Sequence, residues 1–396
     1  MHSATHQNRP APPATGDAVT GDAGTGTESP VTATAAGDPN PRVVEAGGAG
    51  AEAAHSSEED AGAETEGFRA AAARRRTAAR FARQVAELSA GAFDCPLPGS
   101  GRTAERFAAL TAVAEQDLCL ARLVEGHVDA VAILAELGGP PPGPGERWGV
   151  WAAESPGEGL TATRTDRGWT LSGLKPYCSG AHSCTHALVT ANAGDGRRLF
   201  AVRTGAAGDG TGCRPVAGSW QALGMAGSDT PDVRFHTVPA EPVGAVARYL
   251  TRPGFQHGGI GVAACWYGGA RAVAAVLVET ASRRGPDPLT DAHLGAVDMR
   301  LHAAGAVLRQ AAAEIDRDPY DTEGAARVRG LRVRAFVESV CADVLTHVGR
   351  ATGAGPLCHD ERHARNTADL AVYIRQHHAE RSLAELGGLA VRKESS

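Results

Sequence analysis

The chain has 396 residues, of which 42% are hydrophobic, so it is long enough to bury a sizeable core. Its formal net charge of −6, from 45 acidic and 39 basic residues, provides no basic footprint for a nucleic-acid partner. No apolar run approaches the roughly 18 residues of a membrane-spanning helix, and the first residues lack a signal-peptide pattern, which predicts a cytoplasmic protein without a membrane partner.

Residues 1–66 have the composition of a disordered tail. They consist mainly of Ala, Gly, Thr, Pro, Asp and Glu, with almost no large apolar side chain, and end in the acidic run SSEEDAGAETE. Such a segment cannot bury enough surface to offset the entropy lost on ordering. We therefore expect the fold to begin near Gly67.

Residues 67–147 read as a helical domain. Apolar residues recur at helical spacing from Gly67, and a further helical stretch ends at the run GGPPPGPG. A basic face includes Arg74, Arg75 and Arg76. It is either an anion-binding patch or, more commonly, a solvated helix face.

Residues 148–249 are dominated by short β-type runs. Examples are WGVWAAE, GWTLSGLKPYCSG and RRLFAVRT, which are separated by turn residues. Residues 250–396 are helical again, in four amphipathic runs with short connections, which predicts a four-helix bundle. Helices, then strands, then helices indicate the α+β fold class and not an alternating βαβ sheet.

The eight cysteines are scattered, without a Cys-x-x-Cys pair or a histidine at zinc-finger spacing. This distribution predicts reduced thiols and no metal site. Cys178 and Cys184 flank a predicted turn and could approach one another, but two free thiols are the plainer interpretation.

Two ordered motifs in the β region resemble the acyl-CoA dehydrogenase family. SGLKPYCSGAHSCTHALVTA, residues 172–191, has the family's Gly-x-Lys pair followed by an aromatic residue and a hydroxyl residue. ALGMAGSDTPDVRFHTVPAEPVG, residues 222–244, has its Ser-Asp-Thr and its strand ending in Val-Pro. AAESPGEG, residues 152–159, is a weaker match. The resemblance implies an N-terminal helical domain, a middle β-barrel-like domain and a C-terminal four-helix bundle.

The resemblance also implies FAD as cofactor. Tyr177 matches an aromatic residue against the isoalloxazine, and Ser179 matches a donor near flavin N5, where reduction places negative charge. Cys178 lies between them. The remaining positions implied to line the flavin are the backbone of Ala153, Glu154 and Ser155.

The nucleotide end of FAD, by the same resemblance, is bound by the bundle of a neighbouring subunit. Arg283 or Arg284 falls near the family's pyrophosphate arginine, and an arginine can bind phosphate with two hydrogen bonds. Arg350 and Gly353 fall in the glycine-rich turn at the adenine and phosphate end. A shared cofactor site implies a homotetramer or at least a dimer.

The family's catalytic glutamate is not found. Ile374 occupies its usual position, and the alternative position on the first bundle helix falls near Gly258. His378 lies one helical turn after Ile374 and would share its helix face, so it is the preferred replacement base ahead of His377. Two further candidates are His257 and Glu380.

Three functions remain open. The first is an FAD-dependent oxidoreductase acting on the CH–CH group of an acyl-CoA or acyl-carrier thioester, with an electron-transferring flavoprotein as possible acceptor. The second is a monooxygenase of the same fold, which uses reduced flavin and oxygen and a histidine near the last helix. The third is a catalytically silent flavin-binding partner of another subunit. Fold alone does not decide among them.

Overall fold

The computed structural model describes residues 51–154, 159–205 and 212–394. Most of the expected tail therefore lies outside the described residues. The chain divides into two compact units, residues 1–57 and residues 58–396. Apart from the first residues of α1, the features that follow belong to the second unit.

Helix α1, Ala51–Ser89, begins earlier than the sequence analysis predicts. Residues 51–66 were expected to be disordered because they lack large apolar side chains. They are nevertheless rich in Ala and Glu, which have high helix propensity. The expected start of the fold at Gly67 is therefore later than the start of this helix.

Two further helices, α2 (Thr103–Gln116) and α3 (Leu118–Leu137), complete the N-terminal helical domain. They are separated only by Asp117, whose extended backbone ends α2. The Asp117 side chain then caps α3 by accepting the Leu120 N–H at 3.0 Å. Gly138, with φ of 74°, ends α3 in the left-handed conformation that favours glycine.

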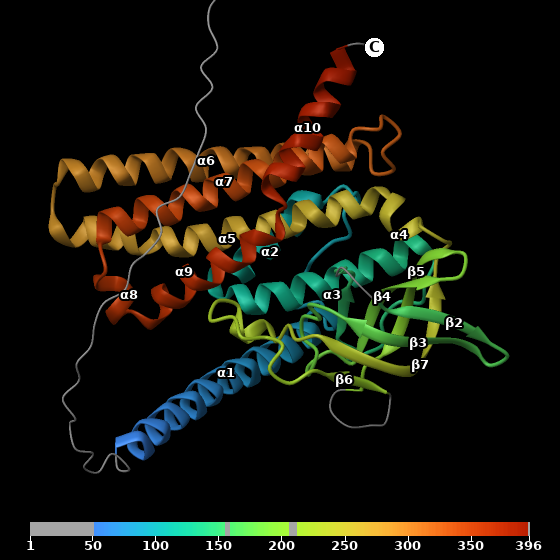
Figure 1. The fold of residues 1–396 in the computed structure, drawn as a ribbon. Coiled ribbons are helices and arrows are strands. Elements are labelled where there is room, and N and C mark those ends of the chain that lie inside the picture. Colours follow the sequence, from blue (N-terminus) through green and yellow to red (C-terminus); the bar gives the residue numbers. More distant parts are fainter. Residues whose placement is uncertain (1–50, 155–158, 206–211, 395–396) are drawn as a thin grey trace, which may run out of the picture. The chain divides into compact units, whose positions relative to one another are not determined.

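The middle domain is a small β-barrel (Figure 1). Its strands are β1 (Trp148–Trp151), β2 (Thr161–Thr165), β3 (Gly168–Lys175), β4 (His186–Ala193), β5 (Gly196–Arg203), β6 (Cys213–Pro215) and β7 (Val233–Val243). The order β4-β2-β3-β7-β5 closes on itself because β5 also pairs with β4. Trp151, Phe200 and Phe235 are almost fully buried and fill its core. The predicted β-barrel-like domain is confirmed.

The C-terminal domain is built around α5 (Figure 1). Its elements are α4 (Arg248–Thr251), α5 (Pro253–Arg284), α6 (Pro288–Arg317), α7 (Ala326–Thr352), α8 (Gly355–His359), α9 (Glu361–Tyr373), the 3-10 turn η2 (Ile374–Gln376) and α10 (Ala379–Glu394). Helix α5 packs against α2, α3, α6, α7 and α9. The last of the four expected helical runs is therefore not one helix but α9, η2 and α10.

Helix α5 is long and apolar enough to cross a membrane by length and composition, but 67% of its most apolar window is buried inside the protein. Small residues in α5 explain how this helix can lie at the centre of the surrounding helices. A Cβ added at Gly268 would meet the backbone of Thr111 in α2, and one at Gly269 would lie 2.7 Å from Leu118 in α3. These glycines let two neighbouring helices approach the α5 backbone closely.

Candidate functional site

The segment after β3 that was predicted to face a flavin forms a tight turn. Tyr177 has a left-handed backbone, φ 55°, and its side chain is 60% exposed. This conformation is uncommon for a bulky residue, and such strained positions cluster at functional sites. Cys178 is fully buried and donates its backbone N–H to the Pro231 carbonyl at 2.9 Å. Cys178 therefore lies beneath the turn, and Tyr177 is the residue that the turn exposes.

Ser179 lies at the end of a chain of hydroxyl groups. Thr230 Oγ1 donates to Ser179 Oγ at 3.1 Å, and the side-chain oxygens of Thr230 and Ser228 are 2.7 Å apart. The Ser179 carbonyl accepts Trp151 Nε1 at 2.9 Å, so its backbone is also fixed. Thr230 Oγ1 also lies 3.3 Å from the Ser228 carbonyl, and its single proton serves only one acceptor at a time. When that proton goes to the Ser228 carbonyl, the Ser179 hydroxyl can donate to Thr230 Oγ1 instead.

Glu154 is held beside the same turn by a buried lysine. Lys175 is 1% exposed, and its Nζ lies 3.2 Å from Glu154 Oε1 and 2.8 Å from the Thr190 carbonyl. Burial lowers the pKa of Lys175, and the Glu154 carboxylate opposes that shift. The pair joins the end of β1 to the end of β3, so Ala153 and Glu154 lie near Tyr177. Ser155 lies outside the described residues.

The η1 loop, which contains the 3-10 turn Ala226–Ser228, links this turn to α9. Asp369 in α9 accepts the Met225 N–H at 2.5 Å and faces the Cys119 thiol at 3.6 Å. Burial raises the pKa of Asp369 to about 6. Gly224 has no room for a side chain, because a Cβ would meet the Ala368 carbonyl. The segment carrying Ser228 and Thr230 is thereby fixed between the barrel and the bundle.

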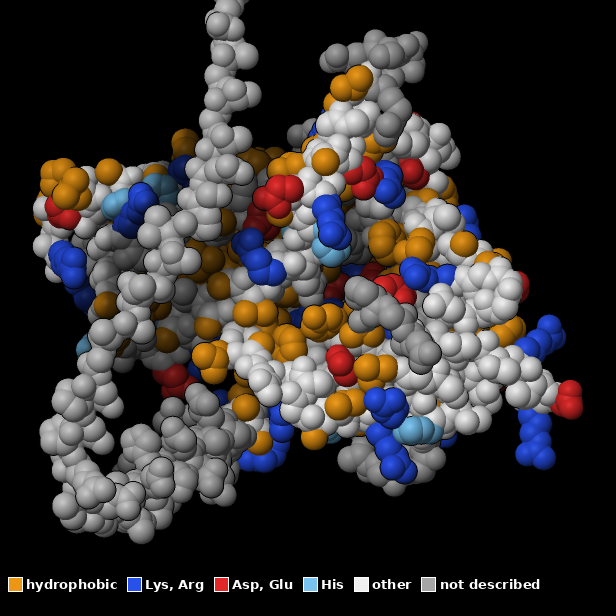
Figure 2. Space-filling model, viewed as in Figure 1, with side chains coloured by type: hydrophobic (Ala, Val, Ile, Leu, Met, Phe, Trp, Pro, Cys, Tyr) orange, Lys and Arg blue, Asp and Glu red, His pale blue; other side chains and the backbone are white. Residues whose placement is uncertain are grey.

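Exposed apolar side chains lie beside these contacts. Figure 2 shows hydrophobic side chains gathered where α9 meets the η1 loop. Leu223, at the start of that loop, is 81% exposed. Leu223 also lines a pocket of about 250 Å³, together with Arg76, Arg80 and Asp369. Arg76 belongs to the predicted basic face of α1, while Arg80 is paired with Asp117 at 2.7 Å.

His377, and not His378, points into the protein interior. His377 is 7% exposed, and its Nε2 has no hydrogen-bond partner among the residues that the structure describes. Its ring lies 6.5 Å from the Trp266 ring, and the Arg334 guanidinium stacks 4.7 Å above the same indole. Burial, and then Arg334, lower the pKa of His377, so its imidazole is neutral at pH 7.

The expectation that His378 shares a helix face with Ile374 was wrong. Helix α9 ends at Tyr373, and after the 3-10 turn His377 is extended, with φ −82° and ψ 130°. His378 and Glu380 are consequently exposed. His257 is buried, and burial lowers its pKa to about 4. Arg334 links this part of α5 to the turn that carries His377, because it donates to the Gly259 carbonyl at 2.6 Å and to the Gln376 carbonyl at 3.4 Å.

A buried ion pair on α3 was missed by the sequence analysis. Arg122 donates to Glu125 Oε2 at 2.7 Å, and both side chains are largely buried. Burial raises the pKa of Glu125 to about 7, although Arg122 acts in the opposite direction. Charged residues three positions apart within the apolar run LCLARLVEGHVDAVAILAEL were the available signal. The buried side of α3 therefore carries a carboxyl group suited to proton transfer near neutral pH.

The residues predicted to bind the nucleotide end of FAD lie at the ends of the bundle helices α5 and α7. Arg283, Arg284, Arg350 and Gly353 are exposed at the end of the bundle away from the barrel (Figure 1). Arg283 pairs with Glu279. Within one chain the structure does not bring these residues to Tyr177 and Ser179, which is compatible with a site shared between subunits.

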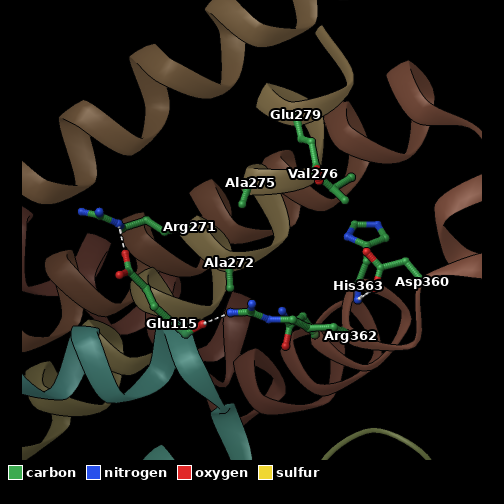
Figure 3. Close-up of a pocket in the computed structure, with 10 residues that line it drawn as sticks. Glu115, Arg271, Ala272, Ala275, Val276, Glu279, Asp360, Arg362 and His363 are labelled. Carbon is green, nitrogen blue, oxygen red and sulfur yellow. Dashed lines mark hydrogen bonds and ion pairs between the residues drawn. The ribbon is translucent and has the colours of Figure 1, made fainter. Parts of the chain in front are cut away.

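A pocket of about 390 Å³ lies between α5, α9 and the end of α2 (Figure 3). Glu279, the partner of Arg283, lines it. His363 contributes a buried imidazole whose Nδ1 has no partner in the described part of the chain. Burial lowers the pKa of His363, so this ring is neutral. The pocket thus combines charged side chains at its rim with a neutral imidazole inside.

Cys178 and Cys184 are both buried and are not joined by a disulfide. Among residues 51–154, 159–205 and 212–394, no three His, Cys, Asp or Glu side chains are grouped to hold a metal ion.

A helical domain, a closed β-barrel and a helical bundle in this order define the acyl-CoA dehydrogenase fold, and the predicted fold is confirmed. The structure is similar to dibenzothiophene monooxygenase TdsC from Paenibacillus sp. A11-2, with a TM-score of 0.64 and 18% identity over 82% of this chain and 97% of that one. It is also similar to KijD3 in complex with FMN and a dTDP-linked sugar, with a TM-score of 0.65 and 19% identity over 83% and 93% of the two chains.

Butyryl-CoA dehydrogenase from Megasphaera elsdenii is a third similar structure, with a TM-score of 0.62 and 20% identity over 72% of this chain and 81% of that one. No family model matches the sequence, and no curated protein matches it. At these identities the similarity establishes the fold, and function must be argued from the site.

Proposed function

We propose that this protein is a flavin-dependent oxidoreductase that binds the isoalloxazine ring against Tyr177 and Ser179. The observation that supports this most is the turn itself, in which an exposed Tyr177 with a left-handed backbone lies two residues before a Ser179 held by Thr230. The exposed Tyr177 ring beside it offers an apolar surface for a flat heteroaromatic ring. A bound flavin would supply the two-electron chemistry, and Ser179 would donate to the ring where reduction adds charge.

FAD is the flavin that we propose, with its nucleotide end held by a second subunit. Exposed arginines at the end of the bundle, Arg283, Arg284 and Arg350, suit a pyrophosphate group. The 390 Å³ pocket lined by Glu279 lies beside Arg283. A homodimer or homotetramer in the cytoplasm is part of this proposal.

Replacing Arg283 and Arg284 together by alanine should weaken FAD binding by about tenfold or more, because charge-assisted phosphate contacts are lost. FMN, which lacks the second phosphate and the adenosine, should bind equally to wild type and variant. Isothermal titration of both flavins measures this difference. An Arg317→Ala variant, which changes an exposed arginine in α6, is the control. Equal FAD affinities for wild type and the double variant would assign the nucleotide end elsewhere.

For the reaction, we favour oxygenation of a compact polar substrate. Ile374, at the position of the missing glutamate, is 1% exposed and cannot remove a proton. The adjoining interior offers the unpartnered Nε2 of His377 and the unpartnered Nε1 of Trp266. These polar atoms would hold a hydroxyl, amide or heteroaromatic group better than an aliphatic acyl chain.

Acyl-thioester dehydrogenation is the second candidate, and one observation favours it. Glu125 is a buried carboxyl with a pKa raised to about 7, so it could replace the missing base. Electron-transferring flavoprotein would then be a partner.

One experiment separates the two reactions. The flavin-loaded protein is mixed anaerobically with butyryl-CoA, and separately with oxygen, indole and a flavin reductase that supplies reduced flavin. Oxygenation predicts no bleaching by butyryl-CoA and formation of a hydroxylated product with oxygen. Bleaching by butyryl-CoA that is lost in Glu125→Gln would instead establish the dehydrogenase. If flavin binds but neither reaction occurs, the result would favour the third function, a catalytically silent flavin-binding partner subunit.

A further inference from the structure

A histidine and a buried aspartate form a second polar pair beside Ser179. His182 follows Ser179 in the turn closed by the Ser183 N–H to Gly180 carbonyl bond of 2.9 Å. Gly180 has φ of 72°, a left-handed conformation that lets the chain reverse here. The His182 side chain is 54% exposed, so a ligand on this surface can reach its ring.

Asp229 holds His182 at two points, one on the imidazole and one on the backbone. Its Oδ1 lies 2.9 Å from His182 Nδ1, and its Oδ2 accepts the His182 backbone N–H at 2.8 Å. Asp229 is 4% exposed and has a left-handed backbone, φ 49°, which is uncommon outside glycine. The other charged group facing this carboxylate is Arg74 of α1, at 3.9 Å from Oδ1. The carboxylate is thus buried, strained in its backbone and aimed at one imidazole nitrogen.

The same loop orients both His182 and Ser179. Thr230, next to Asp229, donates to Ser179, and the Gly180 N–H donates to the Ser228 carbonyl at 2.9 Å. Three consecutive residues of the loop, Ser228 to Thr230, therefore fix the positions of both side chains. His182 consequently stands at the edge of the surface proposed for the flavin.

We propose that His182, oriented by Asp229, is the proton-transfer residue of this site, an inference that rests on the proposed flavin-dependent function. Asp229 accepts the Nδ1 proton, which leaves the lone pair of Nε2 directed to the exposed side. When a substrate hydroxyl is activated, its O–H bond breaks, the electron pair remains on oxygen and an N–H bond forms at Nε2. The imidazolium is then stabilised by Asp229 and releases its proton to water.

The arrangement makes a prediction that does not depend on turnover. Neutral His182 should be protonated on Nδ1, whereas an exposed histidine without such a partner has no carboxylate to fix that tautomer. Nitrogen-15 NMR of the full chain with labelled histidine reads the tautomer directly. Asp229→Asn should abolish the Nδ1–H signature of His182. His236 is exposed on β7 and serves as the internal control. An Nε2-protonated His182 in the wild type would overturn the inference.

The catalytic part is tested on the flavin-loaded protein. His182→Ala should retain flavin and lose turnover by about a hundredfold. Imidazole added to the buffer should restore part of this loss, because a purely structural histidine would not be rescued as a proton carrier. His236→Ala should behave as wild type. Full turnover of His182→Ala, or a loss of turnover that imidazole fails to restore, would refute the role of His182. A wild-type protein without flavin-dependent turnover would instead refute the proposed function, and this inference with it.

Discussion

Replacing His377 by alanine is expected to lower turnover by about a hundredfold or more while flavin remains bound. The neutral imidazole of His377 is buried beside Trp266, and its Nε2 has no hydrogen-bond partner among the described residues. Because His377 is proposed to hold the substrate while His182 transfers the proton, its loss would misplace the reacting group, which commonly costs about 10²-fold in rate. Steady-state turnover, together with the flavin absorbance of the purified variant, measures both parts of the prediction.

His378→Ala is the matched control for this experiment. His378 is the next residue along the chain, but it is exposed, so its loss should change turnover by less than about twofold. The reverse result, with His378→Ala inactive and His377→Ala active, would restore the helix-face argument made from the sequence. It would also show that η2 does not set the direction of these side chains.

Replacing Glu125 by alanine should destabilise the protein by about 3–5 kcal/mol, because the buried Arg122 guanidinium loses its partner. Urea unfolding at pH 8 measures the effect. Glu105→Ala removes the partner of Arg102 in an exposed ion pair, so the urea midpoint should hardly change. Equal midpoints for the two variants would show that the Arg122–Glu125 pair is not buried in solution.

The raised pKa of the Glu125 carboxyl group predicts that the stability of the protein depends on pH. The folded protein raises the pKa of Glu125 from 4.5 to about 7, so the folded state binds more protons than the unfolded state between these values. The stability that comes from a proton on Glu125 is therefore present below about pH 4.5 and is lost as the pH rises through 7, whereas the contact with Arg122 persists above it. Glu125→Gln should lack this decline, which urea midpoints across the range would detect.

Local sequence patterns predicted the fold well, and they failed where local context was not enough. The motifs around Ser179 and Thr230 and the helical periodicity after Gly254 predicted the three-part architecture. The run YIRQHHAE contains no glycine or proline, so nothing in it indicates that α9 ends at Tyr373. The break depends on packing of η2 against the bundle, which a periodicity argument cannot include.

The candidate site was only partly predictable, because several of its groups are paired across long sequence distances. Lys175 belongs to a recognised motif, but its ion pair partner Glu154 lies 21 residues earlier, after the end of β1. His182 and Asp229 are separated by 47 residues. Each residue is unremarkable in its own segment, and the chemistry appears only when the barrel closes.

The central claim is that a flavin lies against Tyr177 and Ser179, and flavin binding to matched tyrosine variants tests it most directly. FAD and FMN are titrated into the full chain, into Tyr177→Ala and into Tyr320→Ala, with visible difference spectra as the readout. Tyr320 is 81% exposed in the connection between α6 and α7 and provides the control. The proposal predicts a perturbed flavin spectrum with wild type and Tyr320→Ala, and binding at least tenfold weaker with Tyr177→Ala. No flavin binding by the wild type, or equal binding by both variants, would contradict it.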